Sequence, residues 1–380
     1  MSEYSCRNLF PAALQSAYLD TAAEGLPVPA MERALSEYAE QKARGTPGRL
    51  KHFTKEMEAR ELAAQLLGTD VLTVTFAPST SDALNILAAS FPFKPGDEIV
   101  ISDLEFPSNV LPWLALRRNG VRVVVVPSVA GEVRLQDLLE AITSKTRLVS
   151  ISLVSYKTGA YFPYISDLAE AAHSVGAALC VDATQALGRC AVSLAGVDYL
   201  MASTFKWLMG PHGLAIVYVS PEFRQRFELA GVGWYSVETA FSKDRFERYS
   251  LKPGAACIAA GMPNFGSLYS LCESLRFLLS LDLDRERKRV DQLSRELRQS
   301  LQEKPVNMLT PESAGLVSGI VSFEHPEAVR VGDILNQLGV IVWAGDGRVR
   351  ASLHFYNDRS DIVRCVSALD SALFQVAHAS

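Results

Sequence analysis

The chain has 380 residues, of which 48% are hydrophobic and 21% charged, and its formal net charge at pH 7 is −5. This length favours two domains with a sizeable core, and the lack of a basic stripe argues against a nucleic-acid-binding surface. No apolar run approaches the roughly 20 residues needed to span a bilayer, and the N-terminus lacks a secretory signal pattern. The six cysteines and six histidines show no metal-ligand spacing. We therefore expect a cytoplasmic protein with no structural metal and no nucleic-acid or membrane partner.

Seven short and nearly continuous apolar runs alternate with helix-like segments up to residue 220. Such runs are typical of strands that are buried on both faces of a sheet. The alternation predicts an α/β fold with a mostly parallel sheet. The predicted strands cover residues 72–78, 98–102, 122–127, 147–155, 178–184, 199–204 and 214–220.

After residue 220 a loop region leads into a long helical stretch, at about 266–303, whose charged middle predicts one solvated face. Two short strands at 315–325 and 339–345, the segment 348–355 and an amphipathic helix from about 359 complete the chain. We predict a large sheet domain (residues 16–260) and a smaller α+β domain (residues 261–380), with residues 1–15 joined to the smaller one.

Polar or aromatic residues stand at the carboxyl ends of four predicted strands. They are Thr80 and Ser81 after the first strand, Glu105 and Phe106 after the second, Asp182 and Gln185 at the fifth, and Ser203 and Lys206 at the sixth. Ligands of open parallel sheets bind outside the carboxyl ends of the strands. We therefore expect these residues to meet at one ligand site.

The segment PSTSDALN predicts the start of a helix. Ser79 and Asp82 have the spacing of a capping box, so free N–H groups would point outward beside the hydroxyls of Thr80 and Ser81. Such a helix start binds anions, most naturally a phosphate, although the same residues also suit a simple cap. A dinucleotide is not expected, because no G-x-G-x-x-G follows the first strand.

Asp182 and Lys206 each have an ordinary structural interpretation. A carboxylate among apolar neighbours needs a cation or a hydrogen bond, so Asp182 is compatible with a structural salt bridge, and most lysines are simply solvated. Taken with the anion site, however, an aspartate and a lysine at neighbouring strand ends suit a cationic heterocycle that bears a phosphate and forms an imine.

Two motifs connect this pattern to a known family. The run V-D-A-T-Q-A-x-G at 181–188, followed by S-x-x-K-W-L-x-G-P-x-G at 203–213, resembles the class V aminotransferase family of fold type I pyridoxal-phosphate (PLP) enzymes, which includes cysteine desulfurases and isopenicillin-N-epimerase-like proteins. YLDTAAEGLP, FAPSTSDALN, LEFPSNVLPW, GWYSVE, GMPNF and VRASLHFYN extend the resemblance along the chain. It implies PLP as cofactor, a seven-stranded large domain and a homodimer.

The resemblance implies a role for each matching residue on the cofactor side. Lys206 matches the lysine that holds PLP as a Schiff base and moves the α-proton of the substrate. Asp182 matches the acid that keeps the pyridine nitrogen protonated, and Gln185 matches the residue that hydrogen-bonds the phenolic oxygen. The matching phosphate ligands are Thr80, Ser81 and Ser203.

Other positions match the substrate side or depart from the family pattern. Arg350 matches the arginine that binds the α-carboxylate, which implies an amino-acid substrate. Phe106 replaces a histidine that stacks on the ring in many relatives, and Tyr156 replaces an asparagine that contacts cofactor and substrate. Phe205 replaces a phosphate-binding histidine, and Met262 replaces a threonine that reaches the phosphate of the partner subunit.

One departure concerns the reaction itself. Cysteine desulfurases carry a catalytic cysteine on a loop just before the carboxylate-binding arginine, whereas here VIVWAGDGRVRASLH contains Trp343 and no cysteine. We therefore do not expect a persulfide to form by that route. We expect an aminotransferase, with a β-lyase that cleaves the C–S bond of cysteine or cystine, or an epimerase, as the alternatives within the family.

A serine hydrolase is a further alternative. Ser203 and Lys206 also form an S-x-x-K, and Lys157 begins a K-T-G, both of which occur in penicillin-binding acyl-serine enzymes. The two motifs stand here in the reverse order, and Ser203 ends a predicted strand instead of opening a helix.

Overall fold

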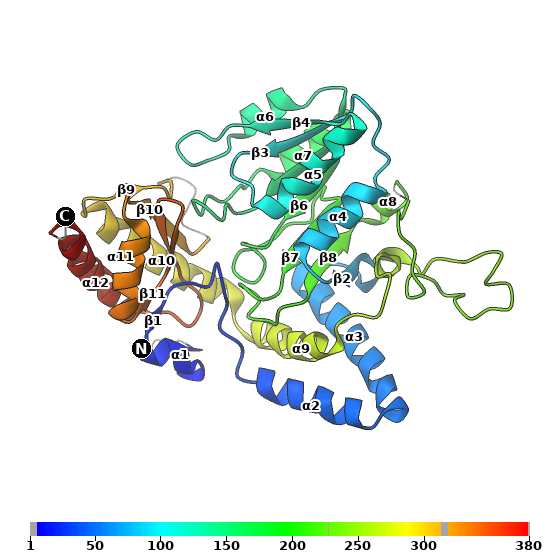
Figure 1. Ribbon diagram of the computed structural model, residues 1–380, viewed down its shortest axis with the longest axis horizontal. Coiled ribbons are helices and arrows are strands. Elements are labelled where there is room, and N and C mark those ends of the chain that lie inside the picture. The colour runs from blue at the N-terminus through cyan, green and yellow to red at the C-terminus, as the bar shows by residue number, and fades with distance from the viewer. Residues whose placement is uncertain (1–5, 227, 313–317, 379–380) are drawn as a thin grey trace.

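The computed structural model describes residues 6–226, 228–312 and 318–378. Its centre is a seven-stranded sheet in the order β2-β8-β7-β6-β5-β3-β4 (Figure 1). All pairs are parallel except those of β8, which runs antiparallel to β2 and β7. The strands are β2 (Val74–Ala77), β3 (Glu98–Ser102), β4 (Arg122–Val126), β5 (Thr146–Ser152), β6 (Ala178–Asp182), β7 (Tyr199–Ser203) and β8 (Ala215–Val219). The predicted α/β fold and mostly parallel sheet are confirmed.

How deeply each strand is buried depends on its position in the sheet. Every residue of β2, β3, β6, β7 and β8 is buried, as continuous apolar runs predict. The prediction of burial on both faces is wrong for β4, where Val125 is 48% exposed. β4 is the last strand of the sheet, and its faces are covered only in part.

Some helices flank the sheet, and three others pack together as a separate bundle. α4 packs against β7 and β8, α7 packs against β5 and β6, and α2, α3 and α9 pack together. Within the described ranges, no helix combines the length and apolar character needed to cross a bilayer. The helices are α1 (Pro11–Gln15), α2 (Met31–Ala43), α3 (Thr46–Leu67), α4 (Thr80–Ser90), α5 (Leu111–Ala115), α6 (Leu135–Ala141), α7 (Ile165–Ser174), α8 (Pro221–Arg224), α9 (Phe265–Ser280), α10 (Leu283–Gln302), α11 (Ala328–Gln337) and α12 (Arg359–Ala377).

The C-terminal part contains an antiparallel sheet in the order β12-β13-β10-β9 (Figure 1). α10 and α11 pack against this sheet, and α12 packs against these two helices. Its strands are β9 (Asn307–Met308), β10 (Ile320–Glu324), β12 (Trp343–Gly345) and β13 (Arg348–Ser352). The predicted strand 339–345 is split, because β11 (Val340–Ile341) pairs with β1 (Ala17–Tyr18) while β12 pairs with β13. The predicted helix 266–303 is also two helices, since the side chain of Asp282 caps α10 by accepting from the N–H of Arg285. Residues 315–317 of the predicted strand 315–325 lie outside the described residues.

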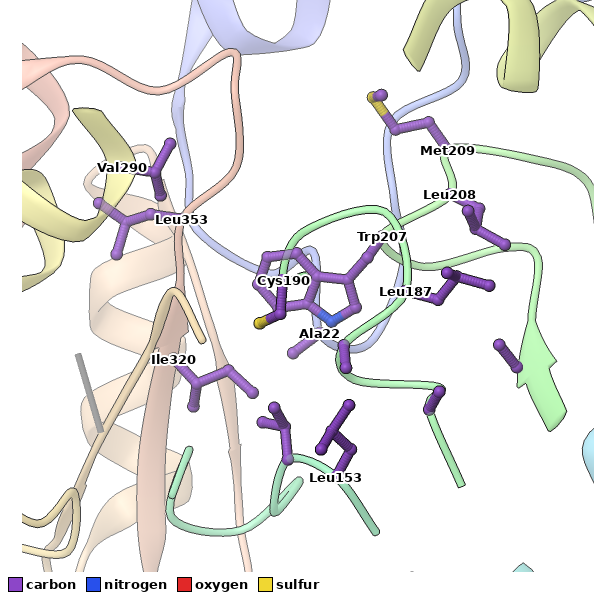
Figure 2. Close-up of a cluster of buried hydrophobic side chains, with 14 of the residues drawn as sticks. Ala22, Leu153, Leu187, Cys190, Trp207, Leu208, Met209, Val290, Ile320 and Leu353 are labelled. Atoms are coloured by element: carbon purple, nitrogen blue, oxygen red, sulfur yellow. The ribbon is translucent and has the colours of Figure 1, made fainter. Parts of the chain in front are cut away.

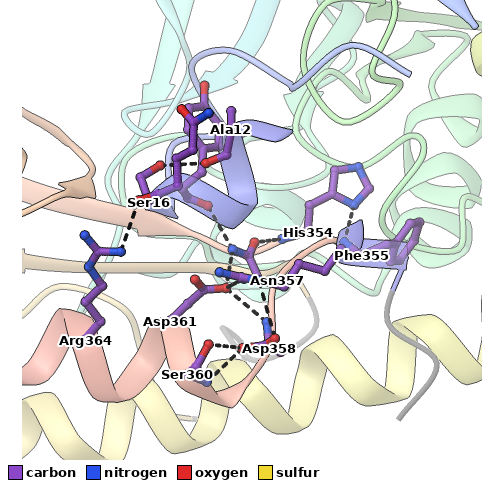
Figure 3. A network of polar contacts seen from close by, with 12 residues as sticks. Ala12, Ser16, His354, Phe355, Asn357, Asp358, Ser360, Asp361 and Arg364 are labelled. Atoms are coloured by element: carbon purple, nitrogen blue, oxygen red, sulfur yellow. Dashed lines mark hydrogen bonds and ion pairs between the residues drawn. The ribbon is translucent and has the colours of Figure 1, made fainter. Parts of the chain in front are cut away.

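The N-terminal segment packs on this C-terminal part through polar contacts (Figure 3). The Asn357 side chain donates to the carbonyl of Tyr18 at 2.9 Å and to the carboxylate of Asp361 at 3.0 Å. Arg364 donates to the carbonyl of Gln15 at 3.3 Å. Because β1 also pairs here while α9 packs against α2 and α3, the domain division at residue 260 stays a proposal.

Candidate active site

A cavity of about 240 Å³ lies at the carboxyl ends of the central strands. Its lining includes every residue that the sequence assigned to the cofactor: Thr80, Ser81, Phe106, Asp182, Gln185, Ser203 and Lys206. Tyr156 also lines it, and the guanidinium of Arg350 donates to the carbonyl of Tyr156 at 2.9 Å. The fold therefore brings together side chains from positions 80 to 350 of the chain.

The first turn of α4 forms one end of the cavity. Ser79 is its N-cap, and the Ser79 hydroxyl oxygen accepts from the N–H of Asp82 at 3.1 Å and donates to the Asp82 carboxylate at 2.6 Å. The hydroxyls of Thr80 and Ser203 lie 3.3 Å apart. Hydroxyl groups beside the free N–H groups of a helix start make a suitable phosphate site.

Ser108 adds a hydroxyl to this end of the cavity that the sequence did not reveal. Its oxygen lies 2.8 Å from the hydroxyl of Ser81, and both residues line the cavity. Ser108 belongs to the short 3₁₀ helix η3 (Pro107–Asn109), which follows Phe106. Ser108 stands two residues after Phe106 in the motif LEFPSN. This short spacing is the signal from which a role for Ser108 at the cavity could have been predicted.

The backbone of Lys206 is held by the residue that follows it. Trp207 is fully buried between Leu187 and Leu208 of the sheet region and Ile320 and Leu353 of the C-terminal part (Figure 2). Burial of a large aromatic side chain with its N–H paired fixes the position of the chain strongly. Trp207 therefore determines where the Lys206 side chain begins.

Hydrogen bonds complete this anchor. The indole N–H of Trp207 donates to Oε1 of Gln185 at 2.6 Å, and Nε2 of Gln185 donates to the carbonyl of Ala22 at 3.0 Å. Nε2 of His354 donates to the carbonyl of Trp207 at 2.8 Å, and burial lowers the pKa of His354 to about 3, so its imidazole is neutral. Gln185 thus connects the cofactor side of the cavity to the N-terminal segment.

The N-terminal loop crosses directly over the backbone of the lysine. The N–H of Gly25 donates to the carbonyl of Phe205 at 2.8 Å. A Cβ atom on Gly25 would lie only 1.9 Å from the carbonyl oxygen of Lys206. The YLDTAAEGLP motif therefore needs a glycine at its eighth position because no side chain fits between the two chain segments.

The amine of Lys206 lies between two aromatic rings. Nζ is 5.3 Å from the ring centre of Phe106 and 5.5 Å from that of Phe205. Burial is the largest cause that lowers the pKa of Lys206 to about 8, and the nearby charge of Arg350 lowers it further. A lysine in this state reaches its neutral, nucleophilic form far more readily than a solvated one.

Asp182 is the buried carboxylate of the cavity. It ends β6, and its Oδ1 accepts from the N–H of Thr184 at 2.8 Å. Burial raises the pKa of Asp182, while the hydrogen bonds from Thr184 and the charge of Lys206 oppose that change. A cationic group within the cavity would favour the ionised carboxylate further.

Arg350 is 4% exposed and does not line the cavity itself, but it lies beside the cavity through its hydrogen bond to Tyr156. Its Nη2 is 3.8 Å from Oδ1 of Asp20, a residue of the YLDTAAEGLP motif for which the sequence predicts no role. Burial raises the pKa of Asp20 to about 6, although the charge of Arg350 opposes this effect. Asp20 is therefore a distant partner of Arg350, although it is still mostly ionised at pH 7.

Two of the residues that depart from the family pattern, Phe205 and Met262, have surroundings that the structure shows. Phe205 stacks on the imidazole of His212, with ring centres 4.1 Å apart and planes at 20°. Met262 does not line this cavity and lies instead in a second one of about 570 Å³, together with Asp82 and Asn85 of α4. The predicted homodimer stays a proposal.

The comparisons with known proteins agree with this geometry. The family model for aminotransferase class V matches residues 17–365. The chain belongs to the aminotransferase class V family. It is thus a member of a PLP-dependent enzyme family, as the sequence predicted.

Relatives and solved structures match the chain almost end to end. A probable cysteine desulfurase of Pseudomonas putida is 31% identical over 96% of each chain, and one of Methanothermobacter thermautotrophicus is 29% identical over 94% of each. The structure of a cysteine desulfurase from Thermococcus onnurineus superposes with a TM-score of 0.88 and 26% identity, covering 97% of this chain and 98% of that one. The fold type I architecture is therefore confirmed, and these names favour the lyase alternative over the expected aminotransferase.

The serine-hydrolase alternative disagrees with the geometry. Ser203 ends β7 and does not open a helix. Thr158 of the K-T-G lies in a turn after β5, where its hydroxyl donates to the carbonyl of Gly131 at 2.9 Å. Neither motif has the setting that acyl-serine chemistry requires.

Proposed function

We propose that the protein is a PLP-dependent β-lyase that removes the α-proton of an amino acid and releases a sulfur substituent from the β-carbon, as in the cleavage of cysteine or cystine. The observation that carries this proposal is the position of Lys206 between the cofactor residues and Arg350. The desulfurase names of the relatives support sulfur chemistry. They lead us to prefer the lyase to the aminotransferase that the sequence predicted.

The cavity has the groups that PLP requires. Hydroxyls at a helix start, a buried carboxylate and a lysine of lowered pKa line one space. We assign the phosphate to Thr80, Ser81 and Ser203, the pyridine nitrogen to Asp182, the phenolic oxygen to Gln185, the ring face to Phe106, and the aldehyde to Lys206. When bound, PLP supplies a ring that accepts electrons from the substrate's α-carbon.

The residues around the cofactor would then act on the amino acid. Arg350 binds the α-carboxylate, a charge-assisted contact that contributes about 1.5–3 kcal/mol. The neutral amine of Lys206 takes the α-proton. The Cα–H electrons form a Cα=Cβ bond as the Cβ–S bond breaks and sulfur leaves with its electron pair, and water then converts the enamine product to a keto acid and ammonia. Tyr156 contacts the substrate at the cavity wall.

Sulfur would leave without a protein cysteine as acceptor. None of the six cysteines of the chain lines the cavity, and five of them are buried. Where desulfurases carry their cysteine loop, β12 and β13 are joined directly by Asp346 and Gly347. The proposed product is therefore free sulfide or a small-molecule persulfide.

Product analysis tests the proposal. The PLP-loaded protein is incubated with L-cysteine or L-cystine, and pyruvate and ammonia are measured. Release of both without an added keto acid is expected. Product that forms only when a second keto acid is present would instead establish the aminotransferase, and bond cleavage that persists fully in Lys206→Ala would contradict both.

A further inference from the structure

Arg348 is a second buried arginine beside the site, and the proposed function does not use it. It is 3% exposed and lies two residues before Arg350 on β13. Side chains two residues apart on a strand share one face and are separated by roughly 6.6 Å. Arg348 and Arg350 therefore present two guanidinium groups side by side.

Aromatic rings connect Arg348 to the cavity. Its guanidinium lies 4.5 Å from the ring centre of Trp343 and 5.4 Å from that of Tyr156. Tyr156 lines the cavity and contacts Phe106 edge to face, with ring centres 5.0 Å apart. Phe106 in turn lies over the amine of Lys206. Arg348 does not line the cavity itself, but it contacts Tyr156, which forms part of the cavity wall.

Carboxylates compensate these two arginines poorly. The Nε atoms of both Arg348 and Arg350 have no hydrogen-bond acceptor among the described residues. The carboxylate found beside Arg348 belongs to Asp346, at 3.4 Å, and its side chain is 75% exposed. Asp20 lies 3.8 Å from Arg350. Arg189 also has an unpaired Nε, but its Nη2 is in direct contact with the carboxylate of Asp291.

Two adjacent buried cations with so little compensation repel each other. Burial is the largest cause that lowers the pKa of Arg350 to about 10; the charge of Asp20 opposes this change, and repulsion from Arg348 adds to it. A substrate with one carboxylate would satisfy Arg350 alone and leave Arg348 with only the exposed carboxylate of Asp346 among the described residues. A substrate with two anionic groups would neutralise both, and the separation of the two residues suits a chain of about four to six atoms.

We propose that Arg348 binds an anionic group on the substrate's side chain while Arg350 binds the α-carboxylate, so that the substrate class is an amino acid with an acidic side chain. The acidic group is a carboxylate or a sulfur oxyanion. This inference rests on the proposed function, because it assumes that an amino acid occupies the cavity. Trp343 and Tyr156 hold the Arg348 guanidinium in place through cation–π contacts.

Equilibrium binding of two simple acids to the PLP-loaded protein tests the inference without turnover. Succinate carries two carboxylates and butyrate carries one on a chain of the same length, and calorimetry gives Kd for each. We expect succinate to bind at least tenfold more tightly to the wild-type protein. Equal affinities would overturn the inference, and this comparison needs no variant.

Substitution then assigns the preference to Arg348. In Arg348→Gln the Kd of succinate should rise at least tenfold, whereas Arg348→Lys should keep part of the preference. Arg330→Gln is the matched control, because it removes the same charge from an exposed position on α11. The absorbance of bound PLP shows that each variant is folded. A preference retained in folded Arg348→Gln, or lost equally in Arg330→Gln, would contradict the assignment.

The product assay separates this inference from the proposed function. S-carboxymethyl-L-cysteine and S-ethyl-L-cysteine differ in the acid at the end of the side chain. Faster elimination from the first, by at least tenfold in kcat/KM, is expected. Elimination without any preference would refute the acidic substrate class alone, whereas a succinate preference without elimination would refute the lyase alone.

Discussion

The two sides of the cavity differ in how completely the protein satisfies its own polar groups. On the cofactor side, Gln185, Trp207 and His354 donate or accept hydrogen bonds of 2.6–3.0 Å with one another or with the backbone. On the substrate side, Arg348, Arg350 and Asp20 have buried atoms without hydrogen-bond partners in the described part of the chain.

This contrast has a physical explanation. A buried polar group without a partner costs about 1–3 kcal/mol, and a ligand that pairs with the group recovers part of this cost. A cofactor that stays bound needs a rigid frame, which the paired groups around Trp207 provide. Under the proposed function, a substrate that enters and leaves needs groups that can bind it, and the Nε of Arg350, which has no partner among the described residues, is such a group.

Lys206→Ala should have the largest effect, because it removes the amine that both sides share. We expect kcat to fall by at least about 10³-fold, as loss of a general base commonly costs up to 10⁴-fold. Borohydride should also no longer fix PLP to the protein. Turnover and absorbance after reduction measure the two effects, and fixation at an unchanged level would assign the cofactor to another lysine.

Arg350→Gln tests the substrate side alone. Loss of one charge-assisted contact of 1.5–3 kcal/mol predicts that kcat/KM falls roughly 10- to 150-fold. The absorbance of bound PLP should stay unchanged, because the substituted side chain lies outside the cofactor residues. Steady-state kinetics give kcat/KM, and the absorbance spectrum of the same preparation shows whether PLP is bound. A variant that loses PLP would show that Arg350 also affects cofactor binding.

The pH dependence of PLP binding depends on residues from both sides of the cavity, because Arg350 is one cause of the lowered pKa of Lys206. A folded pKa of about 8 for Lys206 means that the amine is mostly protonated at pH 7 and mostly neutral at pH 9. The rate of PLP incorporation into the apoprotein should therefore rise by up to about tenfold between these values. Stopped-flow absorbance measures it. In Arg350→Gln the midpoint should move to higher pH, because the charge of Arg350 is one cause of the lowered pKa.

Gly25→Ala should have the smallest effect on turnover and a clear effect on stability. The added methyl group would overlap the carbonyl oxygen of Lys206, and such overpacking costs about 1–3 kcal/mol of the free energy of unfolding. Gly231→Ala is the matched control, since no atom lies within 4 Å of the added Cβ there. Denaturant unfolding compares the two, and equal stability of both variants would show that the loop over Lys206 can move aside.

The sequence predicted the residues that line the cavity better than the buried residues around Arg350. Asp182, Gln185 and Lys206 belong to contiguous motifs, so their meeting follows from the shared edge of a parallel sheet. Asp20 and Arg348 also stand in motifs that were recognised, yet their importance depends on burial and on distances to Arg350. For Asp20 these quantities arise from a contact with Arg350, 330 residues away. For Arg348 they arise from packing against Tyr156 of another segment, and no local pattern encodes either contact.

By itself, the sequence determined the α/β class, the seven strands and the family, because each depends on local hydrophobic periodicity or on short motifs. The tertiary structure decided the rest. It showed that the helical stretch near residue 281 is broken by a cap, that Trp207 anchors Lys206 between the two parts of the chain, and that two arginines share one buried face. Such features follow from packing and desolvation, which depend on the whole fold and not on neighbours in the chain.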